Sequence, residues 1–353
     1  IFGVSKKCLY SYSYKHSIHK NINSTILLLL YQSVFGSLLT KEITIQLSLM
    51  FMKASLLASF CIDQKVKAFM TCENYYLDVD GMNLIAPIMG IRSLSYQYSN
   101  MSEIGLQMMT TANIIYTFSS MFHDRWSRLR FNPQELNNIG YPFDSSFKLV
   151  LGRSKILREE LTKIGASFII CFLDESVQDN KDKYGLISFD DHLREIITLS
   201  ELVLHDPSIA VIIKSQFMKN SPNILYKGNE TIERAKETRR FVELSTGLHR
   251  NIIFPAEAAL SSDLVIGHVV GATAGLESAL VDRRCILLNP YNMQGSNIEV
   301  YKRADILYDD IRSAIEAVSG LRRGCTEFKD LGLWDSIIDQ FDPYRDGQSA
   351  ARL

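Results

Sequence analysis

The sequence lacks the signatures of several large protein classes. Its six cysteines are scattered and never spaced as C-x-x-C, a pattern typical of buried thiols in a reducing compartment rather than of zinc sites or disulfide frameworks. The formal net charge is -1, which argues against a general nucleic-acid binder, because affinity for a phosphate backbone needs a basic surface. The histidines show no metal-ligand spacing. We therefore expect a cytoplasmic protein with no metal site and no nucleic-acid partner.

Long hydrophobic runs are also scarce. The apolar run at residues 26–31, with its continuation to Leu39, is interrupted by Tyr31, Gln32 and Ser33 and is too short to span a bilayer. It also lacks the charged start of a signal peptide. We interpret it as a buried helix, with an interfacial membrane contact as the alternative. Residues 1–23 show no clear strand–turn–helix unit, so we expect the first domain to have lost its beginning.

What the sequence does contain is a double series of strand-like and helix-like segments. In the first half we expect strands at residues 66–72, 91–98 and 114–118, and helices at 41–62, 77–89 and 119–129. In the second half we expect strands at 167–172, 209–214, 251–254, 264–267, 285–288 and 304–308, and helices at 190–204, 231–244, 256–261, 276–281 and 310–321. Such alternation indicates parallel β/α units.

The length of 353 residues suggests two domains. We place the boundary near residues 147–156, after Pro142 and before the second series of strands. The sequence therefore predicts an α/β protein with two doubly wound, Rossmann-like domains that face a cleft. The first comprises residues 1–149 and is incomplete, the second comprises residues 150–325, and residues 326–353 form a helical tail.

Residues 263–290 carry the most informative pattern: a strand, a turn of small residues, a helix and a second strand. The turn runs from Gly271 to Gly275, and Glu277 follows within the first turns of the helix. Small residues let phosphates approach the backbone, and the N–H groups of a helix start favour anions. A carboxylate one turn later can accept hydrogen bonds from hydroxyl groups. The motif is neither a P-loop nor G-x-G-x-x-G, so its spacing fits a nucleotide site and tight helix–strand packing equally well.

Five segments in order carry a family resemblance. They are SYQYS at residues 95–99, IGYPFD at 139–144, VIIK at 211–214, DLVIGHVVGATAGLESA at 263–279 and DPYRDG at 342–347. They are similar to the Q-H-G turn, the G-x-P-x-D segment, the I-K-x-H-P strand end, the donor-binding strand–turn–helix and a tail signature of one group of enzymes. That group is the GT-B glycosyltransferases of bacterial capsule and lipopolysaccharide biosynthesis, with the CDP-glycerol glycerophosphotransferases as near relatives.

The resemblance implies the GT-B fold and a nucleotide-sugar donor held by the second domain. It also implies a glycan or lipid-linked acceptor approaching from the first domain, peripheral association with the inner face of the plasma membrane, and no cofactor or obligatory metal. The sequence departs from the family at Tyr98, Ser99 and Gln216, where the family has His, Gly and His. The absent histidines leave the catalytic activity itself open.

The resemblance implies a transferase that moves a sugar from a nucleotide-activated donor in the assembly of a surface polysaccharide. Three alternatives stay open: a polyol-phosphate transferase that leaves CMP, a nucleotide-sugar epimerase that needs no acceptor, and a catalytically degenerate nucleotide-binding scaffold partner.

The candidate donor-binding residues lie at two strand ends. Glu277 is expected to face the cleft and accept hydrogen bonds from ribose or sugar hydroxyls. Gly271, Ala272 and Thr273 are expected to hold phosphate oxygens, with a plain helix cap as the alternative. Lys214 ends a strand at the carboxyl edge, where a cation could neutralise a diphosphate; an ordinary surface lysine is the alternative.

The candidate catalytic and acceptor-binding residues are more scattered. Glu73 ends the first strand and is placed to act as a general base toward an acceptor hydroxyl, with helix capping as the alternative. His268 could bind phosphate or act as an acid, or it could be a hydrogen-bonded structural residue. Gln97 and Asn100 could bind acceptor hydroxyls, with a polar turn as the alternative.

Overall fold

The computed structural model of the chain describes residues 38–353 except 73–80, 84, 101–110, 125–132, 176, 179–186, 216–224 and 245–253. The chain divides into two compact units. Unit 1 consists of Ile1–Tyr98, Ile104–Ile139 and Leu353, and unit 2 of Ser99–Glu103 and Gly140–Arg352. The division falls between Ile139 and Gly140, earlier than the boundary expected at residues 149–150. The expected boundary lies inside helix α6 (Phe147–Lys163), which packs against α10 (Pro255–Leu260) of unit 2.

Unit 1 contains a parallel four-stranded sheet among its described residues. The strands are β1 (Ala68–Cys72), β2 (Arg92–Tyr96), β3 (Ile114–Thr117) and β4 (Glu135–Asn138), in spatial order β1-β2-β3-β4. The other elements are α3 (Leu38–Asp63) and the short 3₁₀ helices η1 (Ala86–Met89) and η3 (Ser120–Phe122). A small core with Ala58, Met82 and Ile91 joins α3 to the sheet. The first three strands and helix α3 confirm the segments expected from the sequence.

Helix α3 is the long apolar element of unit 1. Its segment Thr44–Asp63 is, by length and composition alone, long and apolar enough to cross a membrane, and less than a third of that segment is buried. Core helices of soluble proteins also meet this criterion. The run at residues 26–37 and the first 23 residues lie outside the described residues.

Unit 2 contains a parallel six-stranded sheet. Its spatial order is β12-β11-β10-β5-β8-β9. The strands are β5 (Phe168–Asp174), β8 (Ile209–Ser215), β9 (Phe241–Glu243), β10 (Leu264–His268), β11 (Arg284–Leu288) and β12 (Leu307–Tyr308). The chain builds outward from β5 to β8 and β9, then returns to the other side of β5 with β10, β11 and β12. This is the order of a Rossmann sheet, with its reversal between β5 and β10.

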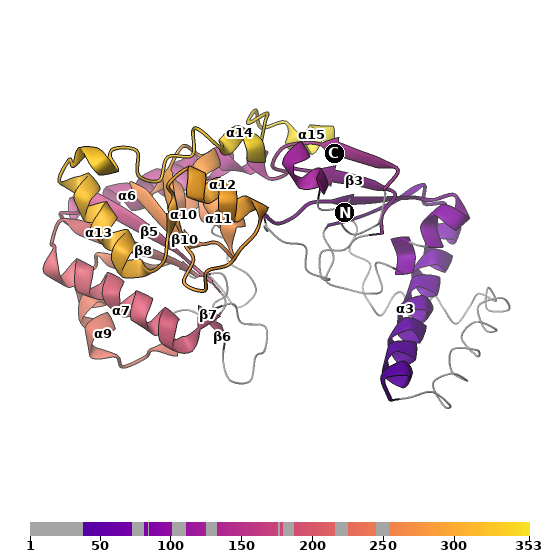
Figure 1. Ribbon diagram of the computed structural model, residues 1–353, viewed down its shortest axis with the longest axis horizontal. Helices are drawn as coiled ribbons and strands as arrows, with labels where there is room; N and C mark the ends of the chain where they lie inside the picture. The colour runs from indigo at the N-terminus through magenta and orange to yellow at the C-terminus, as the bar shows by residue number, and fades with distance from the viewer. Residues whose placement is uncertain are drawn as a thin grey trace. The chain divides into compact units, whose positions relative to one another are not determined.

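Helices cover both faces of this sheet (Figure 1). Helices α7 (Phe189–His205), α9 (Glu230–Glu237) and α13 (Ile311–Arg322) share one core with the apolar strand residues. Helices α6, α10 and α11 (Ala272–Leu280) pack together on the opposite face. Unit 2 also contains η4 (Asp144–Ser146), α12 (Ser296–Arg303) and a two-stranded sheet of β6 (Val177–Gln178) and β7 (Ile187–Ser188).

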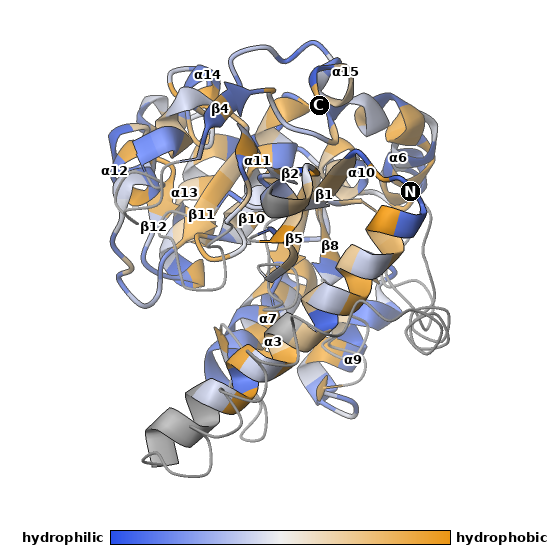
Figure 2. Ribbon diagram, turned by 90° about the vertical axis from the view of Figure 1, so that its right-hand side faces the viewer, coloured by the Kyte–Doolittle hydropathy of each residue, from blue (hydrophilic) through white to orange (hydrophobic). Residues whose placement is uncertain are grey.

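The inner strands are apolar on both faces, as a parallel sheet between two helix layers requires. Every residue of β8 and β10 is buried, and the hydropathy colouring shows the strands of this sheet as mainly apolar (Figure 2). Side chains alternate between the faces along each strand. In β8, Val211 and Ile213 therefore join the core under α7, whereas Lys214 points to the α10 side of the sheet.

The prediction of a helix at residues 231–244 is wrong in its second half. Helix α9 ends at Glu237, and Phe241–Glu243 forms the edge strand β9. Arg239 has a φ of 61°, a left-handed conformation that cannot continue a helix. Arg240 then donates to the backbone oxygens of Asp206 and Ile209 at 2.9 and 2.8 Å, which fixes the start of the strand.

Residues 326–353, expected to form a helical tail, contain three short helices separated by turns. They are η6 (Thr326–Phe328), α14 (Ile338–Phe341) and α15 (Ser349–Arg352). Several hydrogen bonds hold the tail to the rest of unit 2. Trp334 donates to the backbone oxygen of Cys285 at 2.8 Å, Asp342 accepts from the backbone N–H of Tyr141 at 2.9 Å, and the backbone oxygen of Gly332 accepts from the N–H of Cys285 at 2.7 Å. The tail is therefore held by contacts spread along its length rather than by one packed helix.

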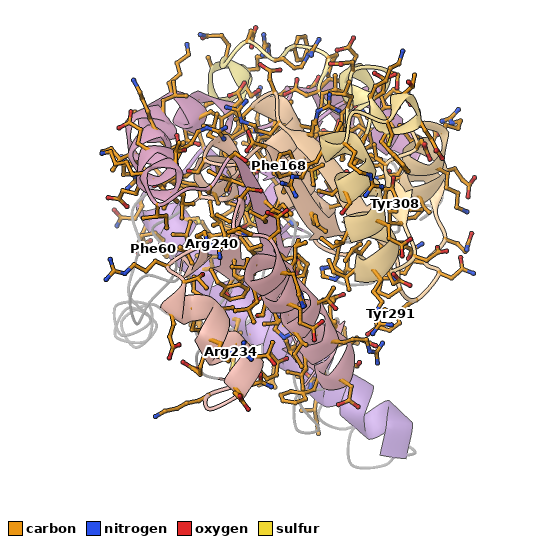
Figure 3. The ribbon with its side chains drawn as sticks, turned by 90° about the vertical axis from the view of Figure 1, so that its left-hand side faces the viewer. Phe60, Phe168, Arg234, Arg240, Tyr291 and Tyr308 are labelled. Carbon is orange, nitrogen blue, oxygen red and sulfur yellow. The ribbon has the colours of Figure 1, made fainter. Side chains whose placement is uncertain are left out.

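Asp206 joins the end of α7 to α13. Its carboxylate accepts from the backbone N–H of Ser208 at 2.9 Å and from Arg322 at 2.6 Å. The guanidinium of Arg322 also lies over the ring of Phe168, 5.6 Å from its centre. Phe168, the first residue of β5, is labelled in Figure 3. Hydrogen bonds from Ser208, and then from Arg322, lower the pKa of Asp206 from 3.8 to about 2.

Replacing Asp206 with Asn should make the chain less stable at neutral pH and less sensitive to acid. A carboxyl group whose pKa falls on folding stabilises the fold when ionised; this contribution is present above pH 3.8 and is lost as the pH falls toward 2. Asp206→Asn should lower the free energy of unfolding by roughly 0.5–1 kcal/mol at pH 7. Urea unfolding across this pH range measures the effect, with the exposed Asp330→Asn as control. An equal loss at both ends of the range would contradict the prediction.

Candidate functional site

The carboxyl edge of the unit 2 sheet gathers buried polar residues where the strand order reverses. Strand β5 ends with Asp174 and is followed by Glu175, β8 ends with Lys214 and Ser215, and β10 ends with His268. All five side chains are buried. Helices leave neighbouring strands toward opposite faces at such a reversal, and open α/β sheets bind their ligands in the resulting crevice. We therefore take this edge as the candidate site.

Lys214 supplies the buried cation of the site. Its Nζ donates to the backbone oxygen of Ser215 at 2.8 Å. An ammonium group carries three hydrogens, so two further donors remain beyond this bond. Burial lowers the pKa of Lys214, and nearby acidic groups, among them Glu277 and Glu175, act in the opposite direction. The lysine expected from the sequence is thus at the strand end but buried inside the edge of the sheet.

Glu277 is buried rather than facing a cleft as expected. Its Oε1 accepts from the hydroxyl of Tyr141 at 2.5 Å, and its Oε2 accepts from the backbone N–H of Ala256 at 3.2 Å. It is only 8% exposed. Burial raises its pKa, while Tyr141, Ala256 and Lys214 act to lower it. The carboxylate therefore joins three parts of unit 2: the segment before α6, the start of α10 and helix α11.

The start of α11 is already occupied by groups of the protein. Gly271 is the residue that caps the helix, and a Cβ placed on it would lie 1.4 Å from Oε1 of Glu175. The hydroxyl oxygen of Thr273 accepts from the backbone N–H of Asn100 at 2.7 Å. The glycine expected to admit a phosphate thus has a carboxylate of the same chain packed against it.

Asn100 belongs to unit 2, although the sequence assigned it to the acceptor side. Its side-chain amide donates to the backbone oxygen of Ala272 at 3.3 Å and to the hydroxyl of Tyr301 at 3.0 Å. Its Oδ1 accepts from Asn297 at 2.9 Å. These bonds use all the polar atoms of a side chain that is 1% exposed, and they fix the loop against the start of α11.

His268 lies on the α7 side of the sheet, where it is 1% exposed. Its Nε2 lies 3.0 Å from Oε1 of Glu195 on α7, and its ring makes an edge contact with Phe172. Burial acts to lower the pKa of His268, but the carboxylates of Glu195, Glu175 and Asp174 outweigh it, so the pKa is raised. Nδ1 has no hydrogen-bond partner among the described residues.

A hydrogen-bonded chain missed by the sequence reasoning lies beside this pair. Asp174 accepts from Ser215 at 3.0 Å and contacts Nε2 of His192 at 2.6 Å, and Nδ1 of His192 contacts the hydroxyl of Tyr226. His192 is completely buried. The chain ties the ends of β5 and β8 to the first turns of α7. The signal available in the sequence was the acidic pair that directly follows the β5 apolar run.

The structure therefore brings most of the candidate residues together. Unit 2 holds the five donor-binding candidates, His268 and Asn100. Gln97 lies in unit 1, where its Oε1 accepts from the backbone N–H of Phe118 at 3.0 Å. Glu73 lies outside the described residues, and so does Gln216. Within the described part of the chain, no group of three or more His, Cys, Asp or Glu side chains could hold a metal ion.

Comparison with solved structures identifies the fold. UDP-GlcNAc 2-epimerase from Neisseria meningitidis, bound to UDP-GlcNAc, superposes with a TM-score of 0.56 at 9% identity, covering 87% of this chain and 80% of that chain. The Staphylococcus aureus MnaA–UDP structure gives 0.56 at 10% identity, covering 87% and 79%. The H444N variant of the wall teichoic acid polymerase TagF gives 0.48 at 10%, covering 95% and 96%.

Sequence comparison adds no relative to these structures. No protein-family model matches the chain, and no curated protein matches it. At 9–10% identity the superpositions establish the fold and nothing finer. The expected α/β, GT-B-like fold with Rossmann-like sheets is confirmed.

Replacing Tyr141 with Phe tests the buried contact to Glu277. The change removes the hydroxyl that donates to Oε1 and leaves a buried carboxylate oxygen unpaired, at a cost of roughly 1–3 kcal/mol in the free energy of unfolding. Burial raises the pKa of Glu277 above its unfolded value of 4.5. Its neutral form is therefore favoured in the fold, and stability is lost as the pH rises through the folded pKa.

Losing the donor should raise this pKa further, so Tyr141→Phe should cost more at pH 7 than near pH 4.5. Urea unfolding at both pH values measures the difference, and Tyr344→Phe, at an exposed position, is the matched control. A cost that is independent of pH would show that Tyr141 stabilises the fold by packing alone.

Proposed function

We propose that the chain is a transferase whose unit 2 binds a nucleotide-activated donor at the reversal between β5 and β10. The donor is a nucleotide sugar, and the sugar is transferred to a glycan or lipid-linked acceptor in surface-polysaccharide assembly. The observation that carries the proposal is the position of Lys214, a buried cation at the carboxyl edge of a Rossmann sheet with donors to spare. Nearby acidic groups of the chain reduce the cost of burying this charge, and its two remaining donors can bind an anionic ligand in the crevice.

The proposed reaction depends on stabilising the negative charge of the leaving group. Transfer of a sugar leaves a nucleoside diphosphate, and negative charge grows on the phosphate oxygen that breaks from the sugar. Fixed positive groups in a water-poor site stabilise that charge in the transition state. The ammonium group of Lys214 is the candidate for this role. Glu277 holds Tyr141 and the start of α10, and through them it shapes the neighbouring wall.

Thr273 can supply a directed hydrogen to the donor. A hydroxyl group has one hydrogen and two acceptor lone pairs. The oxygen of Thr273 already accepts from the backbone N–H of Asn100, so its hydrogen remains available to a phosphate or sugar oxygen. His268 is too deeply buried to reach an acceptor without rearrangement, and we propose that it and Glu195 hold α7 against β10.

The acceptor side rests on the sequence alone. Glu73 and Gln97 remain the proposed residues of unit 1, with Glu73 as the base that deprotonates the acceptor hydroxyl. Peripheral contact with a membrane, as a lipid-linked acceptor would require, is part of the same proposal.

Lys214→Met should weaken nucleotide binding while leaving the fold intact, because Met keeps the length and apolar stem of the side chain. Loss of a charge-assisted contact corresponds to roughly a tenfold to hundredfold loss of affinity. Calorimetry with UDP, GDP, CMP and CDP measures it. Lys302→Met, which alters an exposed pair with Glu299 on α12, is the matched control. Absence of nucleotide binding, or equal binding by both variants, would refute the proposal.

Product analysis then separates the reactions. Release of a nucleoside diphosphate indicates sugar transfer, and release of CMP indicates transfer of a polyol phosphate. Conversion of a UDP-sugar without any acceptor indicates epimerisation. Tight binding without turnover indicates a scaffold.

A further inference from the structure

Glu175 is placed at the centre of the candidate site. It follows the last residue of β5, and β5 flanks the reversal of the sheet. Its side chain is 7% exposed. The carboxylate packs directly on the backbone of Gly271, where an added Cβ would lie 1.4 Å from Oε1 and 2.2 Å from Cδ. Gly271 thus makes room for a carboxylate of the chain itself.

The carboxylate of Glu175 lies among groups that carry positive charge or partial positive charge. Gly271 caps helix α11, and the start of a helix attracts negative charge. Glu175 also lies close enough to interact with Lys214 on one side and with His268 on the other. The place that an anion would take at the start of α11 is therefore filled by the protein. A donor phosphate at the same place would meet a like charge.

We propose that Glu175 recognises hydroxyl groups of the moiety that is transferred, so that the sugar or polyol of the donor lies at the start of α11 and the phosphates lie on the side of Lys214. An ionised carboxylate only accepts hydrogen bonds, and its two oxygens suit the neighbouring hydroxyls of a sugar or polyol. This assignment rests on the proposed function. It makes Glu175 a residue that selects donors by their hydroxyl groups.

The opposite assignment is that Glu175 stands in for a phosphate and leaves when the donor binds. The two assignments predict opposite results for a neutral side chain. If the carboxylate blocks a phosphate, its removal tightens binding of every nucleotide. If it binds hydroxyls, its removal weakens binding only of ligands that carry the transferred group.

The experiment compares the full chain with Glu175→Gln by calorimetry against two pairs of probes, UDP with UDP-GlcNAc and CDP with CDP-glycerol. For the pair whose complete donor binds more tightly than its free nucleotide, Glu175→Gln should lose about tenfold or more in affinity for the donor. Affinity for the free nucleotide should stay within about twofold, because that ligand lacks the hydroxyls in question. Glu159→Gln, an exposed change on α6, is the charge-matched control.

Two further variants guard against misfolding of the first. Glu175→Asp keeps the charge but withdraws the carboxylate by one methylene, and Gly271→Ala puts a Cβ where the carboxylate lies. Each should reduce the preference for the complete donor over the nucleotide, with the melting temperature recorded beside it. A purely structural role would move the melting temperature and leave that preference unchanged.

Each other outcome overturns the assignment. Tighter binding of both members of a pair by Glu175→Gln would make the carboxylate a phosphate substitute. Equal losses for both would make it a general electrostatic or packing residue. A complete donor that binds no better than its nucleotide in both pairs would leave no hydroxyl recognition to assign. Failure of the unchanged chain to bind any nucleotide would instead refute the proposed function, and this inference with it.

Discussion

The reversal of strand order between β5 and β10 is the constraint on which the site depends. Because all strands of the six-stranded sheet of unit 2 are parallel, they all end at the same edge, and a helix follows each strand before the next strand of the sheet. The chain leaves β5 toward α7 on one face and leaves β10 toward α11 on the other. The two strands are neighbours, so their departing segments separate and expose the edge between them. Glu175, which follows β5, and Gly271, which caps α11, therefore lie next to each other at this edge.

Alternation of side chains then sorts the polar groups of this edge into two sets. On the α7 face lie Asp174 and His268, which belong to the same face as the apolar core residues Phe172 and Ile266. On the α10 face lies Lys214. The sheet thus separates the carboxylate–histidine contacts from Lys214, the proposed phosphate-binding residue.

Burial makes the polar groups on both faces of the sheet costly unless each has hydrogen-bond partners. A buried polar or ionisable group is tolerated only where partners replace its water, and removing a partner costs more than the pair contributes. Asp174 meets this condition with His192 and Ser215, and Glu277 meets it with Tyr141 and Ala256. Among the described residues, Lys214 donates one hydrogen bond, to the backbone oxygen of Ser215, so most of its donor capacity remains. The proposed role of Lys214 as a binding group rests on this imbalance.

The sequence was sufficient for the elements whose signal is local. The apolar runs of β5, β8 and β10 and the helix pattern of α7 and α13 lie close to their predicted bounds, because burial between helix layers leaves a continuous apolar segment. Strand β9 could not be predicted. It has three residues, of which only Phe241 is buried, and so short a segment does not stand out from the charged helix pattern before it. The left-handed residue Arg239 that ends the helix has no sequence signature of its own.

The site was predictable by residue type but not by role. Local sequence indicates Lys214 by its position at a strand end and Glu277 by its position after the turn of small residues. Their partners come from far along the chain: Tyr141 is 136 residues from Glu277, and Asn100 is 173 residues from Thr273. No spacing rule links such pairs, since only the closed sheet brings them together. The sequence likewise places Glu175 shortly after an apolar run but gives no sign that it packs on Gly271.

The two glycines of the α11 motif show how one pattern can serve two purposes. A Cβ on Gly275 would lie 2.9 Å from Cδ2 of Leu287 and 3.4 Å from the sulfur of Cys285, so that glycine allows the helix to pack tightly on β11. Gly271, one turn earlier, instead allows a carboxylate to reach the helix start. The small-residue turn therefore combines the packing and the polar interpretation, each at its own residue. The neighbouring strand determines which group lies against the turn, because Glu175 follows β5 and lies where the helix start attracts an anion.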